Sequence, residues 1–174
     1  MRRRIAAALY LRIRMPEHSP SLSRTIAVVR VATGVLFLFF GEYKVAGPGF
    51  AHGGFQQYLQ GYIGGYAVAF YRPFLAHVVL PYAVFFGYFV GVLELWIGVS
   101  LVVGWGVRPA SVAGAFFMLN LALATWWEPG HGVAFWRYFG AELDKIPLLF
   151  LFLIFYGAAA RQPARKDRGS RSRA

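Results

Sequence analysis

The chain has 174 residues, of which 58% are hydrophobic, 18% aromatic and 14% charged, and its formal net charge is +11. Soluble domains carry roughly 25% charged residues, and a core of this size cannot hide so many aromatic side chains, so the composition excludes a soluble globular protein. The lack of cysteine excludes disulfides, a thiol nucleophile and a thiolate metal site within this chain.

Residues 1–24 form a basic lead-in whose apolar stretch, residues 5–11, is interrupted by Arg12. This stretch is short for the hydrophobic region of a secretory signal, and no small-residue cleavage pattern follows it. We therefore expect a cytoplasmic segment that contacts anionic lipid headgroups, an attraction of about 1 kcal/mol for each basic residue near the surface.

Four apolar segments follow, at residues 25–43, 75–103, 109–127 and 143–160. A helix needs about 20 residues to cross the hydrocarbon core of a bilayer, with about 17 as the lower limit, so each segment is a candidate span. The pattern predicts an all-α membrane protein with a four-helix transmembrane bundle over residues 25–160. Pro81 predicts a kink or a separate first turn near the outer end of the second span.

The basic residues predict how this bundle is oriented. Six precede the first span, six lie in residues 161–174, and Arg108 lies in the short turn between spans two and three, so 13 of the 18 are on one side. The positive-inside rule places that side, with both termini, in the cytoplasm of a multi-pass cell-membrane protein. Residues 161–174 are expected to be a disordered tail. Because neither end interleaves aromatic with basic residues, nucleic-acid binding is not expected.

The first outer loop, residues 47–73, is long and far from polar. Tyr58, Tyr62, Tyr66 and Phe70 recur in it every four residues, which places them near one face of a helix. Two interpretations stay open. The segment is either an interfacial helix in the aromatic belt of the membrane or an aromatic lid over a cavity that opens between the spans.

Arg30 and Glu94 place full charges inside the first and second spans. A charge at the centre of a spanning helix costs about 2.5–3.5 kcal/mol on insertion scales, so such groups are functional candidates. Counting along the helices places Glu94 level with Asn120 at mid-membrane and Arg30 about 7 Å nearer the cytoplasm. A direct Arg30–Glu94 ion pair would be strained at this offset, and a water between the two groups is an equal alternative.

Each of these charges shares a helix face with glycines. The two stripes consist of Arg30, Gly34, Phe37, Gly41 and Lys44 in the first span and of Gly87, Gly91, Glu94 and Gly98 in the second. Small residues let helix backbones approach closely, so both charges are predicted to face a neighbouring helix rather than lipid. The polar group made of Arg30, Lys44, Glu94 and Asn120 is then a packing device that fixes helix register, a site for a quinone headgroup, a proton or a small solute, or a set of tolerated charges without a role.

Other chemistry is not indicated by the sequence. His77 is the one histidine inside a span, so a haem held between two histidines is not expected. The carboxylates are few and scattered, and no metal-ligand spacing, nucleotide loop or serine triad is present.

The pattern Arg30-x3-Gly34-x2-Phe37-x3-Gly41-x2-Lys44, followed by Gly91-x2-Glu94-x3-Gly98, Gly104-x3-Arg108 and Met118, resembles that of the DoxX family of small four-helix membrane proteins. The resemblance covers roughly residues 25–160. It implies a membrane subunit of a quinone-linked redox or oxidative-stress assembly, with Arg30, Lys44, Glu94 and Arg108 at family-type positions.

This resemblance also implies a quinone as ligand and soluble or membrane redox proteins as partners, and it does not make the chain an enzyme by itself. Two other function classes stay open. One is a small-solute or proton transporter with the same polar residues along its route, and the other is a non-catalytic membrane scaffold.

Overall fold

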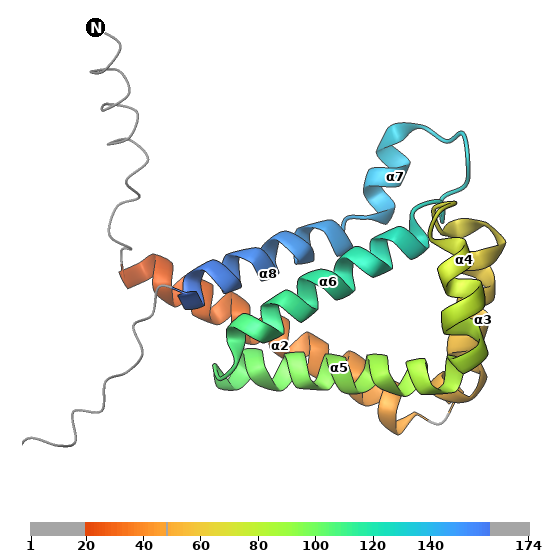
Figure 1. The fold of residues 1–174 in the computed structure, drawn as a ribbon. Helices are drawn as coiled ribbons and strands as arrows, with labels where there is room; N and C mark the ends of the chain where they lie inside the picture. The colour runs from red at the N-terminus through yellow and green to blue at the C-terminus, as the bar shows by residue number, and fades with distance from the viewer. Residues whose placement is uncertain (1–19, 48, 161–174) are drawn as a thin grey trace, which may run out of the picture.

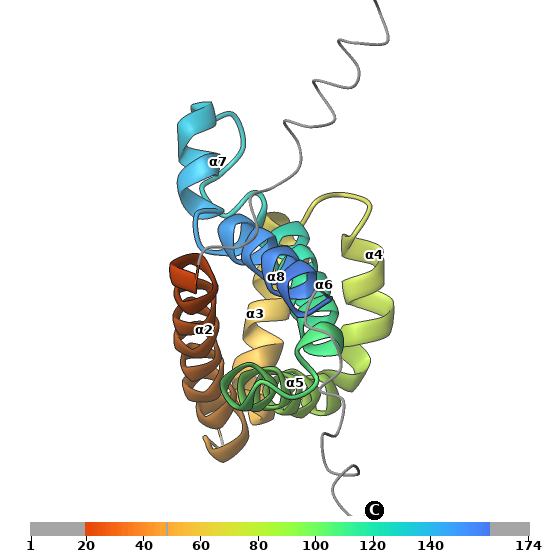
Figure 2. The same ribbon diagram turned by 90° about the vertical axis from the view of Figure 1, so that its left-hand side faces the viewer.

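The computed structural model describes residues 20–47 and 49–160, and within these ranges all regular structure is helical. Four long helices carry the architecture: α2 (Pro20–Ala46), α5 (Ala83–Val103), α6 (Val107–Thr125) and α8 (Lys145–Ala160). They run along a common direction, α2 beside α5 and α6 beside α8 (Figure 1). The view along the bundle shows the four around one centre (Figure 2).

The centre of the bundle is an apolar core to which every long helix contributes. Its buried side chains are Phe37, Ile97, Leu101, Val107, Met118, Phe152 and Phe155. Phe152 stands edge-on to Phe37, with ring centroids 5.3 Å apart, and so joins α8 to α2. Such edge-to-face pairs add about 0.5–1.5 kcal/mol beyond the apolar area they bury.

One end of the bundle is covered by short helices that run across it (Figure 1). In chain order the short helices within residues 49–160 are η1 (Phe50–Gly54), α3 (Phe55–Gly61), η2 (Tyr62–Tyr66), α4 (Arg72–Phe74), η3 (Leu75–Val79), η4 (Leu80–Tyr82) and α7 (Phe135–Ala141). A second apolar cluster, which includes Leu59, Leu75 and Val79, packs the covering segment against Ala124 near the end of α6. We call this covered end the outer end, after the predicted orientation.

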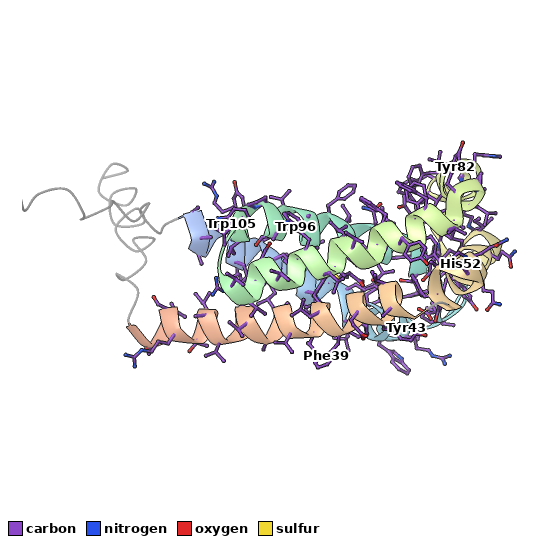
Figure 3. All side chains as sticks on the ribbon, turned by 90° about the horizontal axis from the view of Figure 1, so that it is seen from below. Phe39, Tyr43, His52, Tyr82, Trp96 and Trp105 are labelled. Atoms are coloured by element: carbon purple, nitrogen blue, oxygen red, sulfur yellow. The ribbon has the colours of Figure 1, made fainter. Side chains whose placement is uncertain are left out.

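Among the described residues, three helical stretches are long and apolar enough to cross a membrane: Ser21–Ala46, Arg72–Val103 and Val107–Thr125. Large apolar side chains project from their outward faces, among them Phe39 and Trp96 (Figure 3), which are 68% and 40% exposed. Apolar surface of this kind is what a bilayer covers. The structure therefore has the features of a multi-pass membrane protein.

The fourth predicted span is shorter than expected. Helix α8 has 16 residues, about 24 Å at 1.5 Å per residue, against a hydrocarbon core of about 30 Å. It begins at Lys145 rather than at residue 143, with Pro147 in its first turn, where a missing N–H leaves no helical hydrogen bond unmade. The crossing of the membrane by α8, and with it the cytoplasmic placement of both termini, stays a prediction.

Helix α2, which contains the first predicted span, begins at Pro20, so residues 20–24, expected in the lead-in, are part of it. The hydroxyl of Thr25 donates to the carbonyl oxygen of Ser21 at 3.0 Å within this added turn. The rest of the predicted lead-in and the predicted tail, residues 161–174, lie outside the described residues.

The helix break predicted at Pro81 is present. The chain forms the single turn η4 there, Tyr82 has φ −117° and ψ 34°, and α5 begins at Ala83. Proline lacks the N–H that would continue the helical ladder, and its ring clashes with the preceding turn. The break allows the chain to pass from the covering segment into α5.

Candidate functional site

Helices α2 and α5 touch through their glycines. A Cβ atom added to Gly34 would lie 2.9 Å from the carbonyl oxygen of Gly98, and one added to Gly98 would lie 2.8 Å from that of Gly34. Nearer the outer end of the same interface, a Cβ added to Gly41 would lie 2.9 Å from the carbonyl oxygen of Gly91. The backbones are therefore in direct contact along both predicted stripes, and Gly87 extends the contact to η1, where its added Cβ would lie 3.0 Å from Cα of Ala51.

Glu94 pairs with Lys44 in this interface. Nζ of Lys44 lies 2.5 Å from Oε1 of Glu94, and Glu94 is only 4% exposed. The second carboxylate oxygen, Oε2, is buried and has no hydrogen-bond partner among the described residues. The ammonium group also lies 5.5 Å and 5.8 Å from the ring centroids of Phe50 and Phe117, within reach of cation–π attraction.

Arg30 does not pair with Glu94. Its guanidinium lies against the α5–α6 turn, where a Cβ on Gly104 would be 2.8 Å from Nη1 of Arg30. The reason is the direction of the side chains, because each leans toward the N-terminus of its own helix. In antiparallel α2 and α5, Glu94 and Lys44 therefore lean toward each other, whereas Arg30 leans away.

Asn120 has a different partner again. Its Oδ1 accepts a hydrogen bond from the hydroxyl of Tyr71 at 2.5 Å, and its Nδ2 donates to the carbonyl oxygen of Phe116 at 2.7 Å. The structure thus brings Lys44 and Glu94 together and gives Arg30 and Asn120 separate surroundings.

Arg108, the remaining family-type position, stacks on the ring of Tyr156, 5.0 Å from its centroid. Its Nη2 also donates to the hydroxyl of Tyr156 at 3.2 Å. This contact ties the start of α6 to the later part of α8, at the end of the bundle away from the covering segment.

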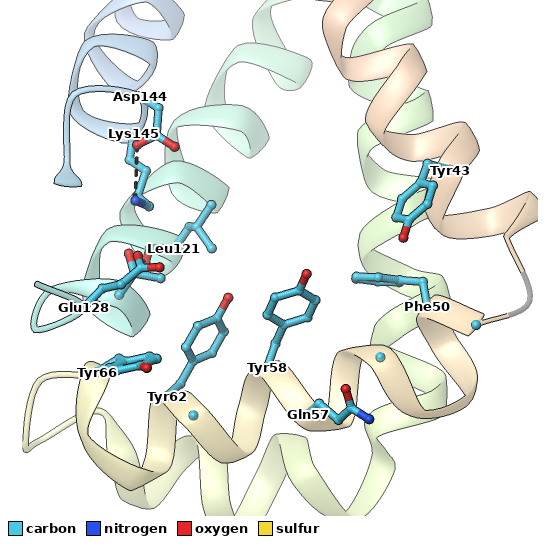
Figure 4. A pocket seen from close by; sticks show the side chains of 14 residues that line it. Tyr43, Phe50, Gln57, Tyr58, Tyr62, Tyr66, Leu121, Glu128, Asp144 and Lys145 are labelled. Carbon is cyan, nitrogen blue, oxygen red and sulfur yellow. Dashed lines mark hydrogen bonds and ion pairs between the residues drawn. The ribbon is translucent and has the colours of Figure 1, made fainter. Parts of the chain in front are cut away.

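A cavity of about 690 Å³ lies at the outer end of the bundle. It is bounded by the end of α2 on one side, by the end of α6 and the start of α8 on the other, and by α3 and η2 (Figure 4). We call it the outer cavity. Its lining residues are Tyr43, Gly49, Phe50, Gly54, Gln57, Tyr58, Gly61, Tyr62, Tyr66, Leu121, Thr125, Glu128, Asp144 and Lys145.

Three of the four residues of the predicted aromatic lid line this cavity: Tyr58, Tyr62 and Tyr66. The rings of Tyr58 and Tyr62 stack, with centroids 6.4 Å apart, and both hydroxyl groups point into the space between α2 and α6 (Figure 4). The prediction is wrong for Phe70, which is 74% exposed. The four-residue repeat is broken before it, because Ala67 adopts an extended conformation, with φ −73° and ψ 150°, that ends the helix.

The cavity combines neutral phenols with charged groups. Burial, with smaller effects from Glu128 and Tyr58, raises the pKa of Tyr62 to about 12, so its hydroxyl remains a hydrogen-bond donor at neutral pH. Lys145 donates to Oδ1 of Asp144 at 3.2 Å on the opposite wall. Within residues 20–47 and 49–160, no group of three or more His, Asp or Glu side chains is placed to hold a metal ion.

Sequence reasoning missed eight side chains of this cavity. They are Tyr43, Phe50, Gln57, Leu121, Thr125, Glu128, Asp144 and Lys145. The available signal was their common position: each lies at or near the outer end of a predicted span or in the first outer loop. Which of the outer ends converge on one space depends on packing between distant segments.

A comparison with protein-family models finds a match that covers most of α2 and all of α5 and α6. A family model described as DoxX matches residues 25–127, more than half of the chain, from within α2 to just past α6. The match includes the Lys44–Glu94 pair and both glycine stripes. No curated protein and no solved structure gives a significant match. The chain belongs to the DoxX family.

Proposed function

We propose that the protein is a membrane subunit of a quinone-linked redox assembly and that the outer cavity receives the quinone headgroup. The observation that carries this proposal is a cavity of about 690 Å³ with four tyrosines in its wall, Tyr43, Tyr58, Tyr62 and Tyr66. A volume in the range of roughly 300–1,000 Å³ is typical of small-molecule sites.

The residue types fit a quinone. Its carbonyl oxygens need hydrogen-bond donors, and phenol hydroxyls and the ammonium of Lys145 are donors at neutral pH. Its ring needs flat apolar partners, and Phe50 and the tyrosine rings offer them. The ammonium of Lys145 forms an ion pair with Asp144 in the cavity wall. This pair places a hydrogen-bond donor where the ligand would bind.

The buried ion pair supports the same proposal. Phe50 lines the outer cavity, and its ring centroid lies 5.5 Å from Nζ of Lys44. A ligand in the cavity would therefore contact a ring that is also near the Lys44–Glu94 pair. The redox partners would dock at the ends of the bundle. The chain would contribute the quinone site in the membrane and would not be an enzyme by itself.

Binding of decylubiquinone to the purified protein in lipid nanodiscs tests the proposal. Tyr62→Phe removes one hydroxyl and keeps the ring, so we expect affinity to fall about 3–10-fold, as for loss of one hydrogen bond. Tyr82→Phe is the matched control, because Tyr82 is 65% exposed and lies outside the cavity. Absence of saturable binding, or equal effects of the two substitutions, would overturn the assignment.

A further inference from the structure

Arg30 is a charged side chain of the bundle that the proposed quinone site does not use. It leans toward the N-terminus of α2, and its guanidinium lies over Gly104 in the α5–α6 turn, where an added Cβ would be 2.8 Å from Nη1 and 3.2 Å from Nη2. Arg30 is partly buried, and its Nε is fully buried with no hydrogen-bond partner among the described residues. A buried donor of a charged group costs free energy while it has no acceptor, so this guanidinium is suited to an acceptor from outside the bundle.

The end of the bundle that holds the α5–α6 turn, which we call the inner end, carries only positive charges within residues 20–47 and 49–160. Arg24, Arg30 and Arg108 lie there, and none of them forms an ion pair within these ranges. Arg108 is exposed in the first turn of α6, where its guanidinium is held over the ring of Tyr156. The carboxylates of the same ranges lie in the middle of the bundle or toward its outer end, at Glu42, Glu94, Glu128, Glu142 and Asp144. The inner end therefore attracts an anion that this part of the chain does not supply.

Trp105 indicates the depth of Arg30 in the membrane. It follows Gly104 in the turn, is 78% exposed and lies at the inner end of the bundle (Figure 3). Tryptophan is enriched at the level of the lipid headgroups, where its ring has apolar and polar surroundings together. Because the guanidinium of Arg30 lies against the same turn, it lies at the headgroup level rather than in the hydrocarbon core.

We propose that Arg30 binds the phosphate group of an anionic phospholipid at the α5–α6 turn. A guanidinium matches a phosphate through parallel N–H···O bonds, and Arg24 and Arg108 attract the same negative charge. A zwitterionic lipid has the same phosphate, but these cations repel its ammonium group, so the headgroup that fits has a net negative charge. Arg30 belongs to the first predicted span, so this site is distinct from the lipid contacts predicted for the basic lead-in. It does not depend on the outer cavity or on a quinone.

Native mass spectrometry of the purified chain, titrated in detergent with dioctanoyl phosphatidylglycerol, tests the site. Arg30→Gln removes the charge and the guanidinium donors, so we expect the affinity for the first bound lipid to fall about tenfold or more, as for loss of hydrogen bonds to a charged group. Arg24→Gln is the matched control, because it removes the same charge from an exposed position of the same helix. It should lower the affinity about threefold or less, as for an exposed charge. Arg30→Lys keeps the charge but loses the planar fork, and an intermediate loss is expected.

Thermal unfolding in phosphatidylcholine nanodiscs separates loss of the site from loss of the fold. Since no described residue pairs with Arg30, Arg30→Gln should unfold close to the wild-type temperature in this lipid. Phosphatidylglycerol should then raise the unfolding temperature of the wild-type protein more than that of Arg30→Gln. Should Arg30→Gln fail to fold, Arg30→Lys carries the test, and wild-type affinity in that variant overturns the guanidinium site.

Dioctanoyl phosphatidylcholine and inorganic phosphate distinguish the source of the phosphate group. Both should bind about tenfold or more weakly than phosphatidylglycerol, the first because of its ammonium group and the second because it lacks acyl chains that pack on the bundle. Affinity equal to that of phosphatidylglycerol for either probe, or equal losses in Arg30→Gln and Arg24→Gln, would overturn the proposal.

Discussion

Lys44 and Glu94 form an ion pair of 2.5 Å between two helices whose backbones touch one turn away, at Gly41 and Gly91. The close approach brings the ammonium within reach of the carboxylate, and the pair in turn is shielded from lipid by the same packing. A charge that is costly in a bilayer is thus neutralised between helices.

Removal of one partner of this pair should destabilise the protein strongly. Lys44→Met leaves the Glu94 carboxylate buried without a counter-charge, for which we expect a loss of about 3–5 kcal/mol in the free energy of unfolding. The double change with Glu94→Leu should recover much of this loss, since no uncompensated charge remains. Thermal unfolding in nanodiscs measures the effect, and Glu42→Gln, at an exposed position of α2, is the control. Equal stability of the Lys44→Met and control variants would show that the pair is not formed.

Added volume at the glycine contact should separate α2 from α5. A Cβ at Gly98 would lie 2.8 Å from both the carbonyl oxygen of Gly34 and Cγ of Leu38, so Gly98→Ala is expected to cost about 1–3 kcal/mol. Gly157→Ala in α8 is the matched control, because nothing lies within 4 Å of its added Cβ. It should be neutral, or more stable by up to about 1 kcal/mol through helix propensity. Equal losses at the two glycines would contradict the close contact.

The titration of Tyr62 should be visible at high pH. The pKa of its phenol is raised from 10.0 to about 12, so the folded state keeps a proton that the unfolded state loses in this range. The stability that Tyr62 contributes is complete below the unfolded pKa and is lost as pH rises through the folded one. The free energy of unfolding, measured from pH 9 to 12, should decline less steeply with pH in Tyr62→Phe than in Tyr82→Phe. Identical slopes would place Tyr62 in water.

The orientation can be tested with single cysteines, because the chain has none of its own. Gln57→Cys, in the wall of the outer cavity, should react with a membrane-impermeant maleimide in intact cells. Ser23→Cys, exposed at the start of α2, should react only after permeabilisation. The reverse pattern would place the cavity on the cytoplasmic side.

Features that depend on one helix and its periodicity followed from the sequence. Pro81 breaks the second span because the missing N–H acts locally, and the glycine stripes face a neighbour because a helix has a fixed period. The partner of Glu94 required one more step, the lean of side chains along antiparallel helices, which selects Lys44 over Arg30.

Features that join distant segments did not follow from the sequence. Phe70 continues the tyrosine repeat in sequence but lies beyond the helix end at Ala67, which periodicity does not reveal. Glu142 and Thr125 meet only because α7 returns the chain to the end of α6, and this contact buries the Glu142 carboxyl. Burial of this kind is set by tertiary packing rather than by local pattern.

Photolabelling with a short-chain azidoquinone tests the central claim most directly. In nanodiscs the probe should label residues in 55–66 and the start of α8, and excess decylubiquinone should abolish the labelling while Tyr62→Phe reduces it. Labelling spread over the lipid-facing surfaces of α2 and α5, with no competition by decylubiquinone, would contradict a quinone site in the outer cavity.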